Sequence, residues 1–179
     1  FGISKWPEQY QSLLPSINSS LHKFCSISVR EETGKHLLNS LFKLNSQVVL
    51  DPTLLHVDYD EITGSIVNND EVICYLLNRT KLQLEKTIGL SKSWGKTPKM
   101  ISTIRPTLGF RYVYPPSIEN WIRYIAGAKF VITDSFHGLA FSLIYKKQFV
   151  VISPSNGKNS RLKDLLKSVG LEDRYFDES

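Results

Sequence analysis

The strongest structural signal in this chain is Phe130-Val131-Ile132-Thr133-Asp134-Ser135-Phe136-His137-Gly138, continued by Leu139-Ala140-Phe141-Ser142-Leu143-Ile144-Tyr145. A short apolar run precedes a polar segment, and a longer, mostly apolar run follows it. This order predicts a buried strand, a polar turn and a buried helix. In open α/β sheets, ligands bind outside the carboxyl ends of the strands, where helix amino-termini present free N–H groups. We therefore expect a ligand site at this turn, and the turn contains a histidine.

Strands and helices alternate around this stretch from residue 69 to the C-terminus. Strands are expected at 71–77, 99–104 and 149–152, and helices at 80–88, 117–126 and 160–169. The segment 105–116 is expected to be a loop. The alternation predicts the α/β class, with a Rossmann-like, doubly wound parallel sheet.

Residues 1–68 fit only part of a domain. A helical face broken near Pro15 is followed by an expected strand at 24–29, helix at 33–44 and strand at 47–50, which form a βαβ fragment. The acidic and polar segment 58–70 is the best linker candidate. We therefore expect two domains: 1–68, the C-terminal part of a first Rossmann-like domain plus linker, and 69–179, a second Rossmann-like domain that carries the turn. The chain begins without a Met or a visible leader, so we expect a processed chain or a fragment.

Composition excludes several classes of protein. Hydrophobic residues make up 41% and charged residues 22% of the 179 residues, as in ordinary globular proteins. No apolar run is long enough to span a bilayer. The net charge of +5 suits an anionic ligand, but no basic block with interleaved aromatics predicts nucleic-acid binding.

The cysteines and histidines show no metal-binding spacing, so we expect no metal and no cofactor. Cys25 and Cys74 are expected to be reduced, buried residues of a cytosolic protein. Asn18-Ser19-Ser20 and Asn78-Arg79-Thr80 match the N-glycosylation pattern, which has little weight without a secretion signal.

Three stretches place polar groups directly after an expected strand: 29–31, 133–137 and 153–161. His137 is the candidate general acid or base, because imidazole titrates near neutrality. An isolated histidine is more often bonded to a loop carbonyl. Asp134 or Ser135 is expected to cap the following helix. A Ser135/His137 nucleophile pair is disfavoured, since the glycine frame of a nucleophile elbow is missing.

Two further groups could hold an anion. Lys158 and Arg161 flank the start of the last helix, where Ser160 is the expected cap, and could form an anion cradle. Arg161 could equally lie on a solvated helix face. Arg30 has the same ambiguity, with Glu31 and Glu32 available as surface partners.

An ordered set of motifs resembles the polysaccharide pyruvyl transferase family. These motifs are Ser26-Ile27-Ser28-Val29-Arg30-Glu31, Val49-Leu50-Asp51-Pro52, Thr133-Asp134-Ser135-Phe136-His137-Gly138 and Ser160-Arg161. The resemblance covers nearly the whole chain and implies a GT-B-like fold, with two Rossmann-like domains facing a cleft and the first only partly present here.

The resemblance also implies an activity. Such enzymes transfer the enolpyruvyl group of phosphoenolpyruvate to a sugar of a cell-surface polysaccharide or its precursor, forming a pyruvate ketal. His137 would be the catalytic acid, and Arg30, Lys158, Ser160 and Arg161 would contact the donor. Ser135, a further expected substrate contact, stands where some relatives carry an arginine. The acceptor would be a glycan or a lipid-linked oligosaccharide, met in the cytoplasm at the inner face of the membrane with peripheral membrane association.

Two other readings remain open. A GT-B glycosyltransferase would use a nucleotide-sugar donor and bind a nucleoside diphosphate. An inactive relative would bind a glycan or a partner protein without a donor. Phe110, Tyr112 and Tyr114 could stack on a sugar in any of these, although core packing is the commoner role for at least one of them.

Overall fold

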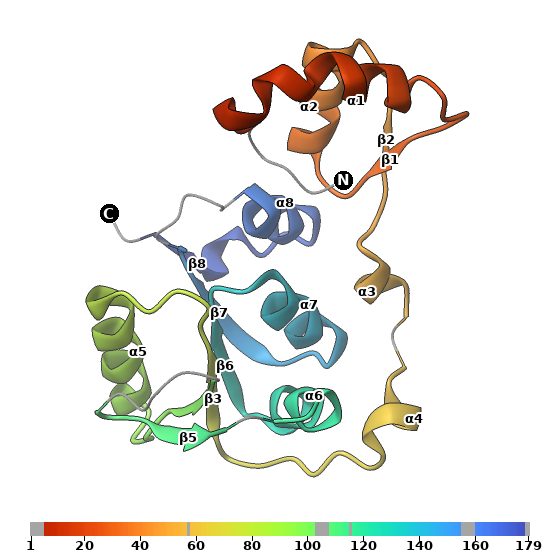
Figure 1. The fold of residues 1–179 in the computed structure, drawn as a ribbon. Helices are drawn as coiled ribbons and strands as arrows, with labels where there is room; N and C mark the ends of the chain where they lie inside the picture. The colour runs from red at the N-terminus through yellow and green to blue at the C-terminus, as the bar shows by residue number, and fades with distance from the viewer. Residues whose placement is uncertain (1–5, 57, 103–107, 115, 155–159, 178–179) are drawn as a thin grey trace. The chain divides into compact units, whose positions relative to one another are not determined.

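The computed structural model describes the chain except for residues 1–5, 57, 103–107, 115, 155–159 and 178–179. The chain forms two compact units, Phe1–Leu55 and His56–Ser179. The fold of each unit follows from its own sequence (Figure 1).

The first unit is a small helical segment around a βαβ motif. Its elements are η1 (Glu8–Leu13), α1 (Leu14–Leu21), β1 (Ser28–Val29), α2 (Glu32–Phe42), β2 (Gln47–Val48) and α3 (Pro52–Leu55). β1 and β2 pair in parallel, as the predicted strand–helix–strand order requires. The core consists of Val29, Leu38 and Phe42. Both strands are shorter than predicted, and Cys25, expected to be buried, is exposed.

The second unit contains a parallel sheet of six strands in the order β5-β4-β3-β6-β7-β8. Its strands are β3 (Val72–Tyr75), β4 (Lys99–Ile101), β5 (Arg111–Val113), β6 (Phe130–Thr133), β7 (Gln148–Ile152) and β8 (Tyr175–Phe176). The chain builds outward from β3 through β4 to β5, then returns to the other side of β3 to form β6. This is the strand order of a Rossmann-type fold, with its switch point between β3 and β6. The predicted α/β, Rossmann-like fold is confirmed.

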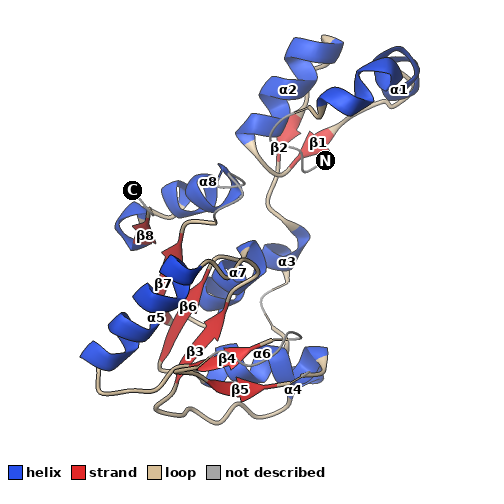
Figure 2. Cartoon of the chain, turned by 60° about the vertical axis from the view of Figure 1, so that its left-hand side comes forward, coloured by secondary structure: helices blue, strands red, loops and turns tan. Residues whose placement is uncertain are grey.

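Helices cover both faces of this sheet. They are α4 (Asp60–Thr63), α5 (Lys81–Ser93), α6 (Ile118–Gly127), α7 (Phe136–Ile144), α8 (Ser160–Ser168) and the short η2 (Glu172–Arg174). α5 lies on one face, and α6 and α7 lie on the other (Figures 1 and 2). No helix within the described ranges is long and apolar enough to cross a membrane.

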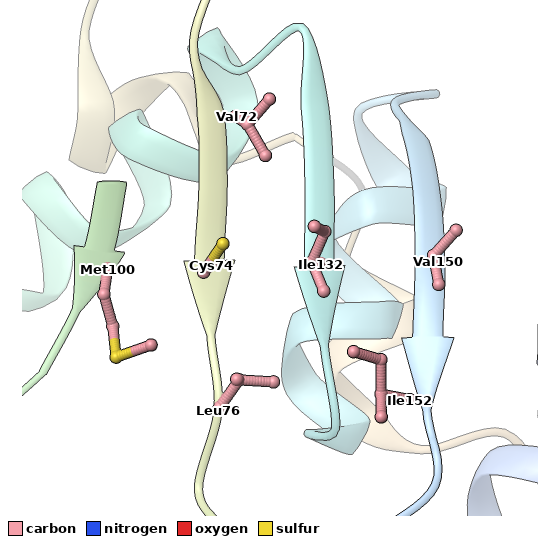
Figure 3. Close-up of a cluster of buried hydrophobic side chains, with 7 residues drawn as sticks. All are labelled: Val72, Cys74, Leu76, Met100, Ile132, Val150 and Ile152. Atoms are coloured by element: carbon pink, nitrogen blue, oxygen red, sulfur yellow. The ribbon is translucent and has the colours of Figure 1, made fainter. Parts of the chain in front are cut away.

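The core follows the alternation of side chains along the strands. Val72, Cys74 and Leu76 point to one face of the sheet, because successive strand residues point to opposite faces. They meet Met100, Ile132, Val150 and Ile152 from the neighbouring strands (Figure 3). Leu84 and Leu90 of α5 pack on this cluster. Burial raises the pKa of the Cys74 thiol, which leaves it unreactive.

The segment expected to be a loop at 105–116 contains the edge strand β5, so that expectation is wrong for Arg111–Val113. Phe110 and Tyr112 pack against the core, and this packing stabilises β5 at the edge of the sheet. Tyr114 is exposed, with 68% of its surface accessible.

The division between the two units lies earlier than the expected boundary after residue 68. Thr63 at the end of α4 is buried, and the Arg123 guanidinium on α6 donates to its carbonyl oxygen at 2.5 Å. The ring of Tyr59 lies 4.9 Å from that of Phe141 on α7. The polar composition of 58–70 predicted a linker, but these contacts attach most of that segment to the second unit.

Candidate active site at the carboxyl ends of β3 and β6

The turn between β6 and α7 is held by its own hydroxyl groups. Ser135 is the N-cap of α7, and its Oγ accepts a hydrogen bond from the Gly138 N–H at 3.4 Å. Thr133 Oγ1 accepts from the Ser135 N–H at 3.0 Å and donates to the Tyr75 carbonyl at 2.7 Å. The capping role predicted for Asp134 or Ser135 therefore belongs to Ser135. These bonds fix the backbone of the turn, partly within the turn and partly against the end of β3.

Gly138 lies against Thr133 too closely for any side chain. A Cβ at this position would lie 2.3 Å from Thr133 Oγ1 and 3.0 Å from Thr133 Cβ. The close approach of the helix to the strand end thus requires glycine, and it fixes where the first turn of α7 begins.

Asp134 joins this turn to the loop that follows β3. Its buried carboxylate accepts from the backbone N–H groups of Leu77 at 2.6 Å and Asn78 at 2.8 Å, and from the Asn78 side-chain amide at 3.1 Å. Burial raises the pKa of the Asp134 carboxyl above its usual value, while these donors act in the opposite direction. We call this set of three hydrogen bonds the Asp134 clamp. It holds together the ends of the two strands that flank the switch point.

A cavity of about 650 Å³ opens at this switch point. It is lined by Tyr75, Leu76, Leu77, Arg79, Ile101, Ser102, Pro116, Ser117, Ile118, Trp121, His137 and Phe141. The polar side chains Arg79, Ser102, Ser117 and His137 come from four separate segments, and the remaining wall is mostly apolar. A cavity of this size and lining is typical of a small-molecule site.

His137 contributes the titratable group on the α7 side. It is exposed in the first turn of α7, edge-on to Phe136 with ring centroids 5.7 Å apart. A helix N-terminus carries a partial positive charge, which favours an anionic ligand next to this imidazole.

Aromatic rings form part of the cavity wall. Trp121 on α6 lies edge-on to Tyr75 at 5.2 Å and to Phe141 at 5.1 Å between centroids. The indole Nε1 is buried, and none of the described residues forms a hydrogen bond with it. Burial, with the nearby Asp134 carboxylate second, raises the pKa of Tyr75. Such rings can stack on the apolar face of a sugar.

The predicted site residues lie in different places. The Arg161 guanidinium lies over the ring of Phe136 at 4.1 Å, next to His137 in sequence. Ser160, the expected cap, is instead the first residue of α8, and its buried Oγ has no hydrogen-bond partner within the part of the chain that the structure describes. Lys158 lies outside the described residues. Within the described ranges, no group of three or more His, Cys, Asp or Glu side chains could hold a metal ion.

Arg30 lies in the first unit, where it pairs with Asp51 rather than with Glu31 or Glu32. Burial alone would raise the pKa of Asp51, but the Thr53 N–H and the Arg30 guanidinium lower it overall. Two of the motifs quoted above, those containing Arg30 and Asp51, are thus joined by this ion pair beyond the ends of β1 and β2.

Arg79, Ser102 and Trp121 were not predicted as site residues. Arg79 lies four residues after the end of β3. Its triplet, Asn78-Arg79-Thr80, drew attention in the sequence only as a match to the N-glycosylation pattern. Arg79 shows the same signal, a polar group just after a buried strand, that selected the other candidates. Ser102 lay inside the strand expected at 99–104, although it directly follows β4, which ends at Ile101. Trp121 carries no such signal, because it lies within α6.

Comparison with known proteins supports the family and the fold. The family model described as polysaccharide pyruvyl transferase matches residues 1–156 of the chain, which confirms the resemblance found in the sequence. No curated protein matches it. The UDP-GlcNAc 2-epimerase of Methanocaldococcus jannaschii is 14% identical, with a TM-score of 0.55 over 98% of this chain and 58% of that chain. The E. coli heptosyltransferase WaaC, solved with ADP, is 17% identical, with a TM-score of 0.37 over 58% of this chain and 46% of that one.

The chain therefore spans about half the length of these solved structures. The epimerase match, at this identity, bears on the fold alone. It agrees with the GT-B-like architecture expected from the sequence.

Proposed function

The chain belongs to the polysaccharide pyruvyl transferase family, and we propose that it transfers the enolpyruvyl group of phosphoenolpyruvate to a sugar of a cell-surface polysaccharide or its precursor. The product is a pyruvate ketal. The observation that carries the proposal is the exposed His137 at the start of α7, opening on a cavity that also contains an arginine and aromatic walls. The donor is a cytosolic metabolite, so the reaction takes place in the cytoplasm, at the inner membrane face when the acceptor is lipid-linked.

His137 acts as the general acid in this scheme. The imidazolium donates a proton to the methylene carbon of phosphoenolpyruvate, which leaves an oxocarbenium-like centre at the carbon that bears the phosphate. A sugar hydroxyl adds at that carbon, phosphate leaves, and a second hydroxyl of the same sugar closes the ketal. Of the two hydroxyl protons, one returns to His137 and the other leaves with phosphate.

The other predicted residues have proposed roles of different kinds. Arg161, stacked on Phe136, and Lys158 supply positive charge for the donor's anionic groups, with Ser160 as a neutral contact. Ser135 acts through the α7 cap, because its hydroxyl already accepts from Gly138. Arg30, held by Asp51 in the first unit, is a further proposed donor contact. The aromatic wall formed by Trp121 and Tyr75 suits the acceptor sugar.

The test compares phosphoenolpyruvate with UDP as ligands of the wild type and of His137→Ala, by calorimetry and thermal unfolding. A ligand at ~100 times its Kd raises the free energy of unfolding by roughly 2.7 kcal/mol. We expect phosphoenolpyruvate to bind both proteins, and phosphate release in the presence of a panel of glycosides to be lost in His137→Ala. His22→Ala is the matched control, since His22 is an exposed histidine bonded to the Asn18 carbonyl in the first unit.

Two outcomes contradict the proposal. Stabilisation by UDP alone would favour a nucleotide-sugar glycosyltransferase. If neither ligand binds or stabilises the protein, a glycan-binding relative without transferase activity is favoured.

A further inference from the structure

Arg79 is a partly buried cation that lines the cavity, and it contacts the neutral hydroxyl of Ser102. It lies in the loop between β3 and α5 and lines the cavity beside His137. Its Nη2 donates to Ser102 Oγ, and its buried Nε has no hydrogen-bond partner among the described residues. Among the residues that the structure describes, no carboxylate forms an ion pair with it.

Other arginines of the chain are balanced differently. Three form ion pairs with carboxylates, Arg30 with Asp51, Arg111 with Glu71 and Arg174 with Asp173, and Arg123 donates to the Thr63 carbonyl oxygen. Removing a guanidinium from water costs free energy, which a carboxylate or phosphate normally offsets. A neutral hydroxyl such as that of Ser102 offsets less of this cost. An anionic ligand bound at Arg79 would offset the remainder.

The backbone on both sides of Arg79 is fixed. The Asp134 clamp holds Leu77 and Asn78. Thr80 caps α5 by accepting from the Gln83 N–H at 3.1 Å, and the Gln83 side chain accepts from the Thr80 N–H at 3.1 Å. A side chain between two anchored neighbours loses less conformational entropy when it binds a ligand.

We propose that Arg79 is the residue of the second unit that binds an anionic group of the ligand, a carboxylate or a phosphate, within the cavity onto which His137 opens. The guanidinium can bind such a group through two parallel N–H donors. This inference rests on the proposed function, where phosphoenolpyruvate supplies both groups. The Asp134 clamp then connects the arginine that holds the donor to the turn that carries the acid.

The experiment measures Kd by calorimetry for Arg79→Ala, Arg79→Lys and Arg174→Ala with phosphoenolpyruvate. Losing a bidentate, charge-assisted contact is expected to weaken binding by about 10- to 100-fold in Arg79→Ala. Arg79→Lys keeps the charge but not the paired geometry, so its Kd should lie between those of the wild type and Arg79→Ala. Arg174→Ala, which removes an equal charge from the η2 region, should bind as the wild type does. Unfolding curves identify any variant that does not fold, in which case Arg79→Lys carries the test.

Two competitors distinguish the anionic groups. If Arg79 holds the carboxylate, pyruvate binding falls in Arg79→Ala and inorganic phosphate binding does not; the reverse result assigns the phosphate. A Kd for phosphoenolpyruvate unchanged in Arg79→Ala would overturn the inference and leave the proposed function standing. If the wild type binds UDP and not phosphoenolpyruvate, the proposed function fails. Loss of that UDP binding in Arg79→Ala would still support Arg79 as the anion contact, and unchanged UDP binding would overturn it.

Discussion

At the scale of single residues, the contact between Gly138 and Thr133 makes a sharp prediction. Gly138→Ala would force its methyl group into Thr133 Oγ1, the atom that bonds both Ser135 and Tyr75. We expect the free energy of unfolding to fall by about 1–3 kcal/mol, as for other overpacked sites. Urea titration followed by circular dichroism measures it.

Gly89→Ala is the matched control for this prediction. Gly89 lies inside α5, and a Cβ there would meet nothing within 4 Å. Alanine is the better helix former, so this variant should be more stable by about 0.5–1 kcal/mol. If both variants changed stability in the same direction, steric contact at Thr133 would not be the cause.

The residues of the turn also show what a sequence can and cannot predict. The capping by Ser135 was predictable, because the N-cap and its partner are three residues apart. The partners of Asp134 were not, since Leu77 and Asn78 are 57 and 56 residues away in the chain. The buried state and clamp role of Asp134 therefore depend on the strand order, which local patterns do not encode.

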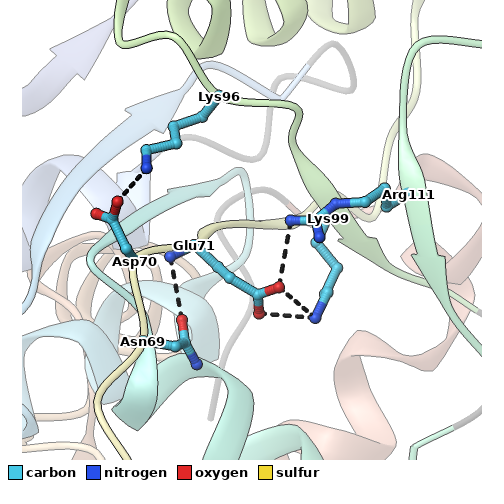
Figure 4. Close-up of polar contacts among 6 residues, drawn as sticks. All are labelled: Asn69, Asp70, Glu71, Lys96, Lys99 and Arg111. Carbon is cyan, nitrogen blue, oxygen red and sulfur yellow. Dashed lines mark hydrogen bonds and ion pairs between the residues drawn. The ribbon is translucent and has the colours of Figure 1, made fainter.

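At the scale of elements, a charge cluster ties together the amino ends of the strands, away from the cavity (Figure 4). Asp70, just before β3, pairs with Lys96 and with Lys129, the latter at 2.7 Å. Glu71 pairs with Lys99 at 2.6 Å and Arg111 at 3.2 Å. These pairs join the starts of β3, β4, β5 and β6, so they support the register of the sheet.

Asp70 predicts how stability depends on pH. Hydrogen bonds from Lys129 and then Lys96 lower the pKa of Asp70 to about 2 from 3.8. A lowered pKa stabilises the folded state above the unfolded value, and this contribution is lost as pH falls from about 4 to about 2. In the wild type, the urea midpoint should therefore fall over this range more steeply than in Asp70→Asn. Asp173→Asn, which changes another exposed carboxylate, is the control.

Salt provides a second check on the same prediction. The side chain of Asp70 is more than half exposed, so its ion pairs are screened by salt. The difference between the wild type and Asp70→Asn should shrink in ~1 M NaCl. If the urea midpoints of the wild type and Asp70→Asn fell in parallel from pH 5 to pH 2 at low salt, this carboxylate would not have the role predicted for it.

The short edge strands are among the elements that the sequence did not predict. β5 has three residues and β8 has two, too few for an alternating pattern to stand out. The central strands β3, β6 and β7 were predicted, because burial on both faces produces continuous apolar runs.

At the scale of the whole molecule, the two units differ in what holds them together. The second unit has a six-stranded sheet covered on both faces, whereas the first has one pair of two-residue strands and a core of three buried apolar side chains. Two strands with so small a core are marginal in isolation. The polar composition of 58–70 placed the sequence-based boundary too late in the chain, since composition cannot show which unit a short helix packs against.

Two truncated chains test where the second unit begins. The fragment 56–179 keeps α4, with the Tyr59–Phe141 contact and the bond from Arg123 to the Thr63 carbonyl. The fragment 69–179, cut at the boundary expected from sequence, loses both. We expect 56–179 to unfold cooperatively and to exceed 69–179 in stability by about 2–4 kcal/mol, from one aromatic contact and one charge-assisted hydrogen bond. Arg123→Ala in 56–179 should lower its stability part of the way toward that of 69–179. The size of this loss separates the contribution of the hydrogen bond from that of the ring contact. Equal stability of the two fragments would return 56–68 to the role of a linker.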